Sequence, residues 1–180
     1  MNGQKNFEPE VREAIHDNLR SIWRFGYALS GSADTADDLA QATFLRALEK
    51  SHQVTSTERL GGWFLTICRS IWLNELRSRT LRRAQSLDTT PEASLPTEKS
   101  DTETNIFARE VLSEVMALPE AQRVAVVLVF VEGHSYRDAA KILEVPMGTV
   151  MSRLHGARGK LRHLSQVDTE HELQKEHGRV

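Results

Sequence analysis

Hydrophobic residues recur every three or four positions in several stretches of this chain, which is the period of an α-helix. In one such stretch, five of them share a single face: Ala36, Ala40, Phe44, Ala47 and Leu48. Residues at this spacing lie one above another on a helix, so this face is expected to be buried. No stretch of useful length shows the alternation of a β-strand. The pattern therefore predicts an all-α protein.

A second helix is predicted over residues 63–83, after a break marked by Gly61 and Gly62. Its buried side is expected to carry Phe64, Ile67, Cys68, Ile71 and Trp72. The opposite face of the preceding helix, with Asp38, Gln41 and Leu45, is expected to point to solvent.

In the second half of the chain, helices are predicted over 106–116 and 121–131, with an interruption at Leu118 and Pro119 and a stop at Gly133. Ser135 then begins another helix, and Asp138 stands three residues later, as in a capping box.

After a short connection at 144–146, a last helix is predicted to run to about Leu164. Its apolar stripe is Val150, Leu154, Ala157 and Leu161. A helix, a tight turn and a basic helix form the helix-turn-helix arrangement, whose second helix enters the DNA major groove. With the stripe buried, Ser152, His155 and Gly156 are expected to face outward.

Residues 85–101, between the two halves, are rich in Ser, Thr, Pro and Glu, without an aromatic residue or a helical stripe. This composition is typical of a flexible linker. We therefore expect a first helical domain at 8–84, a linker at 85–103, a second helical domain at 104–165 and a disordered tail at 166–180.

The 180 residues carry a formal net charge of -2, but the charge is segregated. Residues 69–83 hold five arginines against Glu75 alone, and 153–163 hold four Lys and Arg residues and no acid. Two basic helices of this kind are typical of nucleic-acid contact, although a solvated surface helix is the plainer alternative.

Several other functions find no support in the sequence. The longest apolar run, 124–131, is too short to span a bilayer, and the N-terminus lacks a secretory signal, so we expect a cytoplasmic protein. The single cysteine, Cys68, excludes an internal disulfide and a multi-cysteine zinc site. Because the histidines lack metal-ligand spacing and no phosphate-binding loop follows a strand, no catalysis, metal or cofactor is expected. The alternative is an enzyme, which robust turnover of a small substrate by the purified protein would favour.

Three segments resemble the extracytoplasmic-function (ECF) sigma factors of bacterial RNA polymerase. LPEAQRVAVVLVFVEGHSYRDAAKILEVPMGTVMSRLHGARGKL resembles their region 4, while SADTADDLAQATFLRALEK and WFLTICRSIWLNELRSR resemble their region 2. The resemblance covers about residues 25–164. It implies two helical domains, a region 2 bundle and a region 4 helix-turn-helix, on a chain that directs transcription from specific promoters, in a stress or envelope response.

The resemblance also implies a role for particular residues. Binding to core polymerase is expected of Asp37, Asp38, Gln41 and Leu45. Recognition of the minus-ten element, with capture of a flipped base, is expected of the loop at 52–61 and of Arg69, Ser70, Asn74, Arg77, Arg79, Arg82 and Arg83. Recognition of the minus-thirty-five element is expected of Thr149, Met151, Ser152, Arg153, His155, Gly156 and Arg158.

The partners implied are the clamp coiled coil and flap of core RNA polymerase, promoter DNA and an anti-sigma factor. The chain itself is expected not to insert into a membrane, although a membrane-bound anti-sigma factor would hold it at the inner membrane. Two alternatives stay open: a sigma-like decoy that only binds an anti-sigma factor, and a simple helix-turn-helix regulator. The decoy would not need the basic helices, and the regulator leaves the first domain unexplained.

Overall fold

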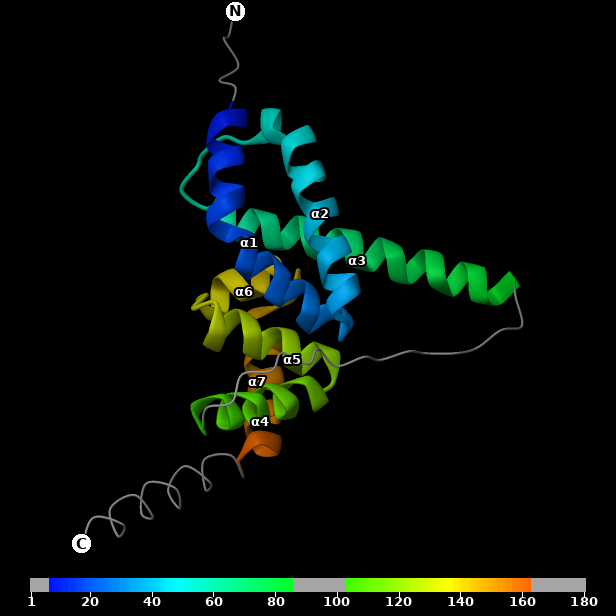
Figure 1. Cartoon of the computed structure of the whole chain (residues 1–180), viewed down its shortest axis with the longest axis vertical. Helices are drawn as coiled ribbons and strands as arrows, with labels where there is room; N and C mark the ends of the chain where they lie inside the picture. The colour runs from blue at the N-terminus through cyan, green and yellow to red at the C-terminus, as the bar shows by residue number, and fades with distance from the viewer. Residues whose placement is uncertain (1–6, 86–102, 163–180) are drawn as a thin grey trace, which may run out of the picture.

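The computed structural model describes residues 7–85 and 103–162, with side chains for 7–82 and 109–162 (Figure 1). All regular structure in these residues is helical, which confirms the predicted fold class. The helices of the first part are α1 (Glu8–Ser30), α2 (Ala33–Glu49), the short η1 (Ser51–Gln53) and α3 (Leu60–Gln85). Those of the second part are α4 (Glu103–Ala117), α5 (Glu120–Val126), η2 (Val127–Val131), α6 (Tyr136–Ile142) and α7 (Met147–Leu161). The predicted linker and tail lie almost entirely outside the described residues.

Helix α1 was not among the predicted helices, yet it is the centre of the first domain, where it packs against both α2 and α3. Pro9 stands in its first turn, where the N–H that proline lacks would have no partner within the helix. Gly31 ends it in the left-handed conformation (φ 73°) and donates its N–H to the carbonyl of Tyr27 at 2.8 Å. The core beneath it includes the fully buried Phe25 and Phe64.

The break predicted at Gly61 and Gly62 is wrong, because both glycines lie inside the first turn of α3. Gly61 allows a close approach of α1, whereas a Cβ would fit at Gly62. A Cβ at Gly61 would lie 2.7 Å from Asn18 Oδ1 of α1, and one at Gly62 would lie 3.8 Å from Ile142 Cδ1 of α6. Helix α3 then leaves the bundle, and its C-terminal half projects away from the rest of the molecule (Figure 1).

The second domain confirms the predicted order of helices. Pro119 is the N-cap of α5, and Gly133 (φ 71°) follows the end of η2. The last turns of this segment are π-helical: the Glu132 N–H donates to the carbonyl of Val127, five residues back, at 2.9 Å. As predicted, Ser135 caps α6, since its Oγ accepts the Asp138 N–H at 3.1 Å and donates to Asp138 Oδ2 at 2.7 Å.

The two domains pack against each other. Helix α1 contacts α5 and η2, α3 contacts α6, and one cluster of buried side chains continues through both domains. Arg123 of α5 joins them: its Nε donates to the carbonyl of Ala28, and its Nη2 to that of Leu29 at 3.4 Å. Its Nη1 donates to Met116 at 2.9 Å and to Leu118 at 3.3 Å. One guanidinium thus caps the C-terminal turn of α1 and the end of α4.

Candidate polymerase and nucleic-acid interfaces

The outer face of α2 presents the side chains predicted to bind polymerase. Asp38, Gln41 and Leu45 are exposed, and Leu45 keeps 66% of its surface in contact with solvent. Asp37 is exposed too, but its Oδ1 accepts a hydrogen bond from Trp23 Nε1 at 2.7 Å. Its carboxylate therefore helps to hold α2 on α1. The three outward residues form a surface of one charge, one amide and one large apolar group.

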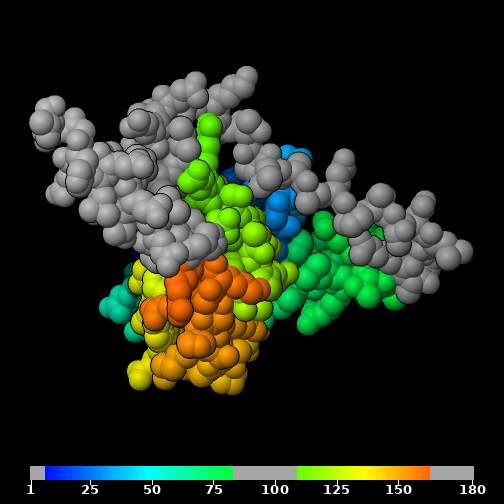
Figure 2. Space-filling view, turned by 90° about the horizontal axis from the view of Figure 1, so that it is seen from below, coloured from blue at the N-terminus to red at the C-terminus, as the bar shows by residue number. Residues whose placement is uncertain are grey.

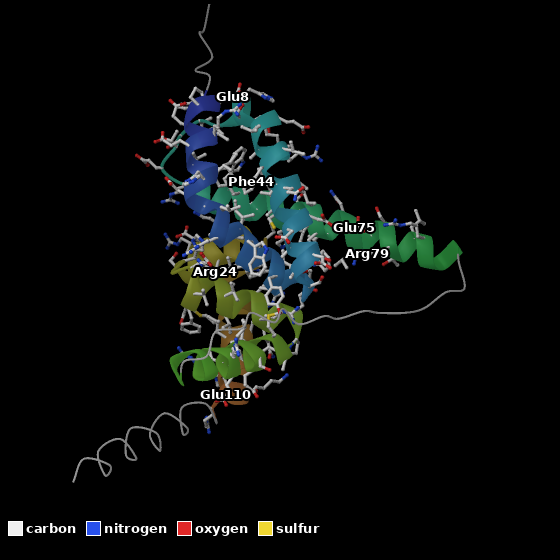
Figure 3. The ribbon with its side chains drawn as sticks, in the orientation of Figure 1. Glu8, Arg24, Phe44, Glu75, Arg79 and Glu110 are labelled. Atoms are coloured by element: carbon white, nitrogen blue, oxygen red, sulfur yellow. The ribbon has the colours of Figure 1, made fainter. Side chains whose placement is uncertain are left out.

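The projecting part of α3 carries a row of cations. Arg77, Arg79 and Arg82 are exposed, as are Ser70 and Asn74, whereas the side chain of Arg83 lies outside the described residues. Figure 3 shows Glu75 and Arg79 on this part of the helix. Arg79 Nε and Arg82 Nη2 donate to Glu75 Oε1 at 2.9 and 3.1 Å. The hydrogen bond from Arg79 is the largest of the effects that lower the pKa of Glu75.

Arg69 differs from the other predicted minus-ten residues. Its side chain is only 18% exposed, and its Nη1 donates to Glu144 Oε2 of the second domain at 2.8 Å. The structure therefore places Arg69 between the domains rather than in the projecting row of α3.

The predicted base-capturing loop is hollowed. The loop predicted at 52–61 consists of the end of η1, the irregular residues 54–59 and the first two residues of α3. A pocket there is lined by Gln53, Val54, Thr55, Ser56, Glu58, Arg59, Leu60 and Trp63. The half-buried Trp63 presents an aromatic group to this pocket, whereas Trp72 is buried, as its helical phase predicted.

Arg59 lies in the loop predicted at 52–61 but was not singled out from the sequence. It lines the loop pocket, and its Nη1 lies 3.7 Å from Asp138 Oδ1 of α6. The sequence signal that could have found it is that Arg59 is the one Lys or Arg in the loop at 52–61.

Helices α6 and α7 form the predicted helix-turn-helix. The turn between them contains Glu144 with φ 49°, a left-handed conformation that a side chain with a Cβ rarely adopts. On α7, the buried stripe is Val150, Leu154 and Ala157, as predicted, with Leu161 half-buried.

The uncovered side of α7 carries most of the predicted base-reading residues. Met151, Ser152, His155 and Arg158 are exposed, while Thr149 and Arg153 are half-buried. Figure 2 shows α7, in orange, at the surface of the second domain. The guanidinium of Arg158 lies over the ring of Phe130, 5.7 Å from its centroid, which fixes this cation at one edge of α7.

Gly156 departs from the expected orientation. It is half-buried, and a Cβ there would meet Gln122 Nε2 of α5 at 2.8 Å, so its free side faces α5 rather than outward. Gly156 directly precedes Ala157 of the apolar stripe, and the glycine lets α5 approach α7 closely. The expectation that it points outward is therefore wrong.

Comparison with known proteins shows the family of the chain. The chain matches Sigma-70 region 2 over residues 14–82 and Sigma-70, region 4 over residues 108–161. It is 35% identical over 158 residues to the ECF RNA polymerase sigma factor EcfG of Rhodopseudomonas palustris, covering 88% of this chain and 86% of the relative. It is 29% identical over 167 residues to the ECF sigma factor SigL of Mycobacterium tuberculosis, covering 90% and 93%.

A solved structure shows the same fold. The sigma factor RpoE of Bartonella quintana, in complex with the anti-sigma factor NepR, superposes with a TM-score of 0.71 at 29% identity, over 87% of this chain and 97% of that one. Region 2 followed by region 4 defines a sigma factor of the sigma-70 class. Within that class, the chain belongs to the ECF RNA polymerase sigma factors.

Proposed function

We propose that this sigma factor binds core RNA polymerase through the outer face of α2, at its clamp coiled coil, and that region 4 binds the flap. The exposed side chain of Leu45 beside Asp38 and Gln41 carries this proposal. A large apolar group ringed by polar ones is a common centre of a protein interface. Asp37 contributes indirectly, because Trp23 holds it against α1.

The minus-ten element is recognised by region 2. The loop pocket beside Trp63 receives an unstacked base, and Arg77, Arg79 and Arg82 neutralise phosphates along the same strand. Stacking and backbone neutralisation together offset the few kcal/mol that unstacking a base costs. Ser70, Asn74 and Arg83 belong to the same proposed surface.

The minus-thirty-five element is recognised by α7. Its exposed Met151, Ser152 and His155 reach base edges, and Arg158 contacts the backbone. Thr149 and Arg153 stand beside them, half-buried. At Gly156 only the backbone is available for contact with DNA, because the side on which a Cβ would lie faces α5.

The chain is proposed to act in the cytoplasm as a non-enzymatic subunit, with domains at 8–84 and 104–165 joined by a linker, and with a C-terminal tail. In the described residues, no helix is both long and apolar enough to cross a membrane. Control by an anti-sigma factor is supported by the solved RpoE structure, whose partner is the anti-sigma factor NepR.

Asp38→Ala is expected to weaken binding to core polymerase by about tenfold, or about 1.4 kcal/mol, because it removes the carboxylate beside Leu45 from the α2 surface. Titration of labelled full-length chain with core polymerase measures this. Glu49→Ala, an acid at the end of the same helix, is the matched control and should bind normally. Equal affinity of the Asp38 variant and the wild type would remove the α2 surface from the proposal.

Ser152→Ala is expected to reduce run-off transcription several-fold from promoters that depend on the minus-thirty-five element, since a lost base contact costs about 1–3 kcal/mol. Core binding should not change. A promoter library transcribed with purified core polymerase measures the effect, and Ser113→Ala, an exposed serine on α4, is the control. A library profile identical to the wild type's would show that Ser152 reads no base. Failure of the wild type to initiate at any promoter would favour the decoy.

A further inference from the structure

We propose, on the basis of the minus-ten contact proposed above, that Glu75 is a positioning residue whose carboxylate holds Arg79 and Arg82 together as a preformed clamp for one DNA phosphate. Glu75 is the one acidic residue between positions 69 and 83. It lies within the run of arginines on α3 (Figure 3), where a negative charge lowers the net positive charge offered to DNA. A carboxylate at this place needs a compensating role if the helix contacts phosphates.

Helical spacing brings the three side chains of the clamp together. Arg79 and Arg82 stand four and seven positions after Glu75, so all three lie on one stripe of α3. Arg79 Nε and Arg82 Nη2 donate to the same carboxylate oxygen, Glu75 Oε1, at 2.9 and 3.1 Å. Two guanidinium groups that converge on one oxygen repel each other, and the negative charge between them offsets this repulsion. The carboxylate therefore keeps the two cations close together.

Each arginine is also held at a second point. The guanidinium of Arg79 lies over the ring of Trp72, 5.6 Å from its centroid, and Trp72 is only 5% exposed. Arg82 Nε donates to the carbonyl of Ser78 at 3.3 Å. Because Trp72 belongs to the buried cluster of the molecule, the clamp is connected to the core rather than carried on a freely moving side chain.

The terminal amino groups of Arg79 are available for a ligand. Among the residues that the structure describes, Arg79 donates only through Nε, and neither of its Nη groups makes a hydrogen bond. A guanidinium held at Nε presents these two groups as a fork, which matches the oxygens of a phosphate. With Arg82 held beside it, a phosphate at this place meets two cations in fixed positions.

The benefit of the clamp is an ordering that DNA binding no longer has to supply. Fixing one flexible side chain on binding lowers affinity by about two- to tenfold, and two are fixed in advance here. The carboxylate also repels the incoming phosphate. Since the three side chains are partly exposed and physiological salt screens charges over about 8 Å, this repulsion changes affinity by less than about twofold. Loss of the carboxylate should therefore weaken DNA binding.

Glu75→Gln tests the direction of this effect. Glutamine keeps the size and helix propensity of glutamate without its charge, so the helix content measured by circular dichroism should not change. The full chain, assembled with core polymerase, is titrated onto a fluorescent promoter duplex that is unpaired at the minus-ten element. The variant should bind about fivefold more weakly, whereas electrostatics alone predicts tighter binding. Glu75→Asp, which keeps the charge on a shorter side chain, should recover part of the loss.

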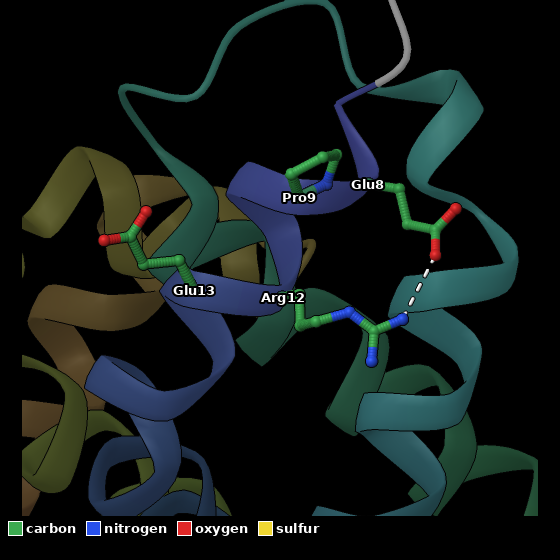
Figure 4. A pocket seen from close by; sticks show the side chains of 4 residues that line it. All are labelled: Glu8, Pro9, Arg12 and Glu13. Carbon is green, nitrogen blue, oxygen red and sulfur yellow. Dashed lines mark hydrogen bonds and ion pairs between the residues drawn. The ribbon is translucent and has the colours of Figure 1, made fainter.

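Glu8→Gln is the matched control, because it makes the same change of charge in a pair of the same spacing. Glu8 of α1 accepts a hydrogen bond from Arg12, four positions later, at 3.1 Å (Figure 4). Figure 3 places Glu8 away from Glu75 and Arg79. Its affinity for the promoter duplex should stay within about twofold of the wild type's.

Arg79→Lys gives a second readout, which separates the fork from the charge. Lysine keeps the positive charge but cannot donate as a fork, so affinity should fall about fivefold while its dependence on salt concentration stays the same. Arg77→Lys is the comparison, since Arg77 Nη1 donates to Asn74 Oδ1 and not to Glu75. A cation outside the clamp should tolerate this change within about twofold.

The outcomes distinguish the clamp from the proposed function. Binding by Glu75→Gln that equals or exceeds the wild type's would overturn the clamp alone, as would an unchanged affinity of Arg79→Lys. A loss confined to promoters with one particular base would assign Arg79 to base reading and overturn the phosphate clamp. If the wild-type chain with core polymerase binds no promoter duplex, both proposals are wrong.

Discussion

Phe64→Ala is expected to lower the free energy of unfolding by about 3–5 kcal/mol, which is a large part of the total stability of a small domain. Phe64 has no exposed surface and lies where α3 crosses the bundle, among the buried side chains shared by α1 and α2. Truncation to alanine removes most of a ring and leaves a cavity that the helices cannot close. Urea unfolding followed by circular dichroism at 222 nm measures the loss.

Leu81→Ala is the matched control, because Leu81 lies on the same helix with 64% of its surface exposed. Its unfolding free energy should stay within about 0.5 kcal/mol of the wild type's. Phe64→Leu, which keeps most of the volume, should fall between the two. A loss below about 1 kcal/mol for Phe64→Ala would mean that the region 2 core is not packed as described.

Arg123→Met is expected to cost about 2–3 kcal/mol of unfolding free energy. Methionine fills much of the same space but donates no hydrogen bond, so the carbonyls of Ala28 and Leu29 at the end of α1 lose their charged partner. Burial lowers the pKa of Arg123, but a guanidinium remains protonated at any pH at which the protein folds. The loss should therefore not vary between pH 6 and pH 9.

Arg137→Met, at an exposed arginine on α6, is the control and should leave the free energy of unfolding nearly unchanged. Unfolding of both variants in urea, followed by tryptophan fluorescence, gives the comparison; the tryptophans all lie in region 2. If Arg123→Met unfolds at the same urea concentration as Arg137→Met, the guanidinium contributes nothing to the contact between the domains.

Local periodicity was sufficient to predict most helices and the outward residues of α2 and α7. Helix α1 was missed although it carries the same signal: Val11, Ile22, Phe25 and Leu29 recur at helical spacing and are buried. The glycines at 61, 62 and 156 were misjudged for a different reason. Gly61 and Gly156 each make room for a neighbouring helix, and the identity of that neighbour depends on tertiary packing.

The contact between the domains could not be predicted from the sequence. Arg24 and Glu132 are 108 positions apart, and Arg69 and Glu144 are 75 apart. Each of these residues is an ordinary surface charge by local pattern, and only the docking of α1 on η2 and of α3 on α6 brings them together. The outward positions of the α7 residues proposed to read bases could be predicted, because one helix and its buried stripe determine them.

The left-handed backbone of Glu144 also has a genetic consequence. Glutamate and glycine codons differ by a single base at the second position, so one transition mutation converts the residue to the amino acid that this conformation favours. Such a substitution improves the turn and discards the carboxylate facing Arg69 in the same step.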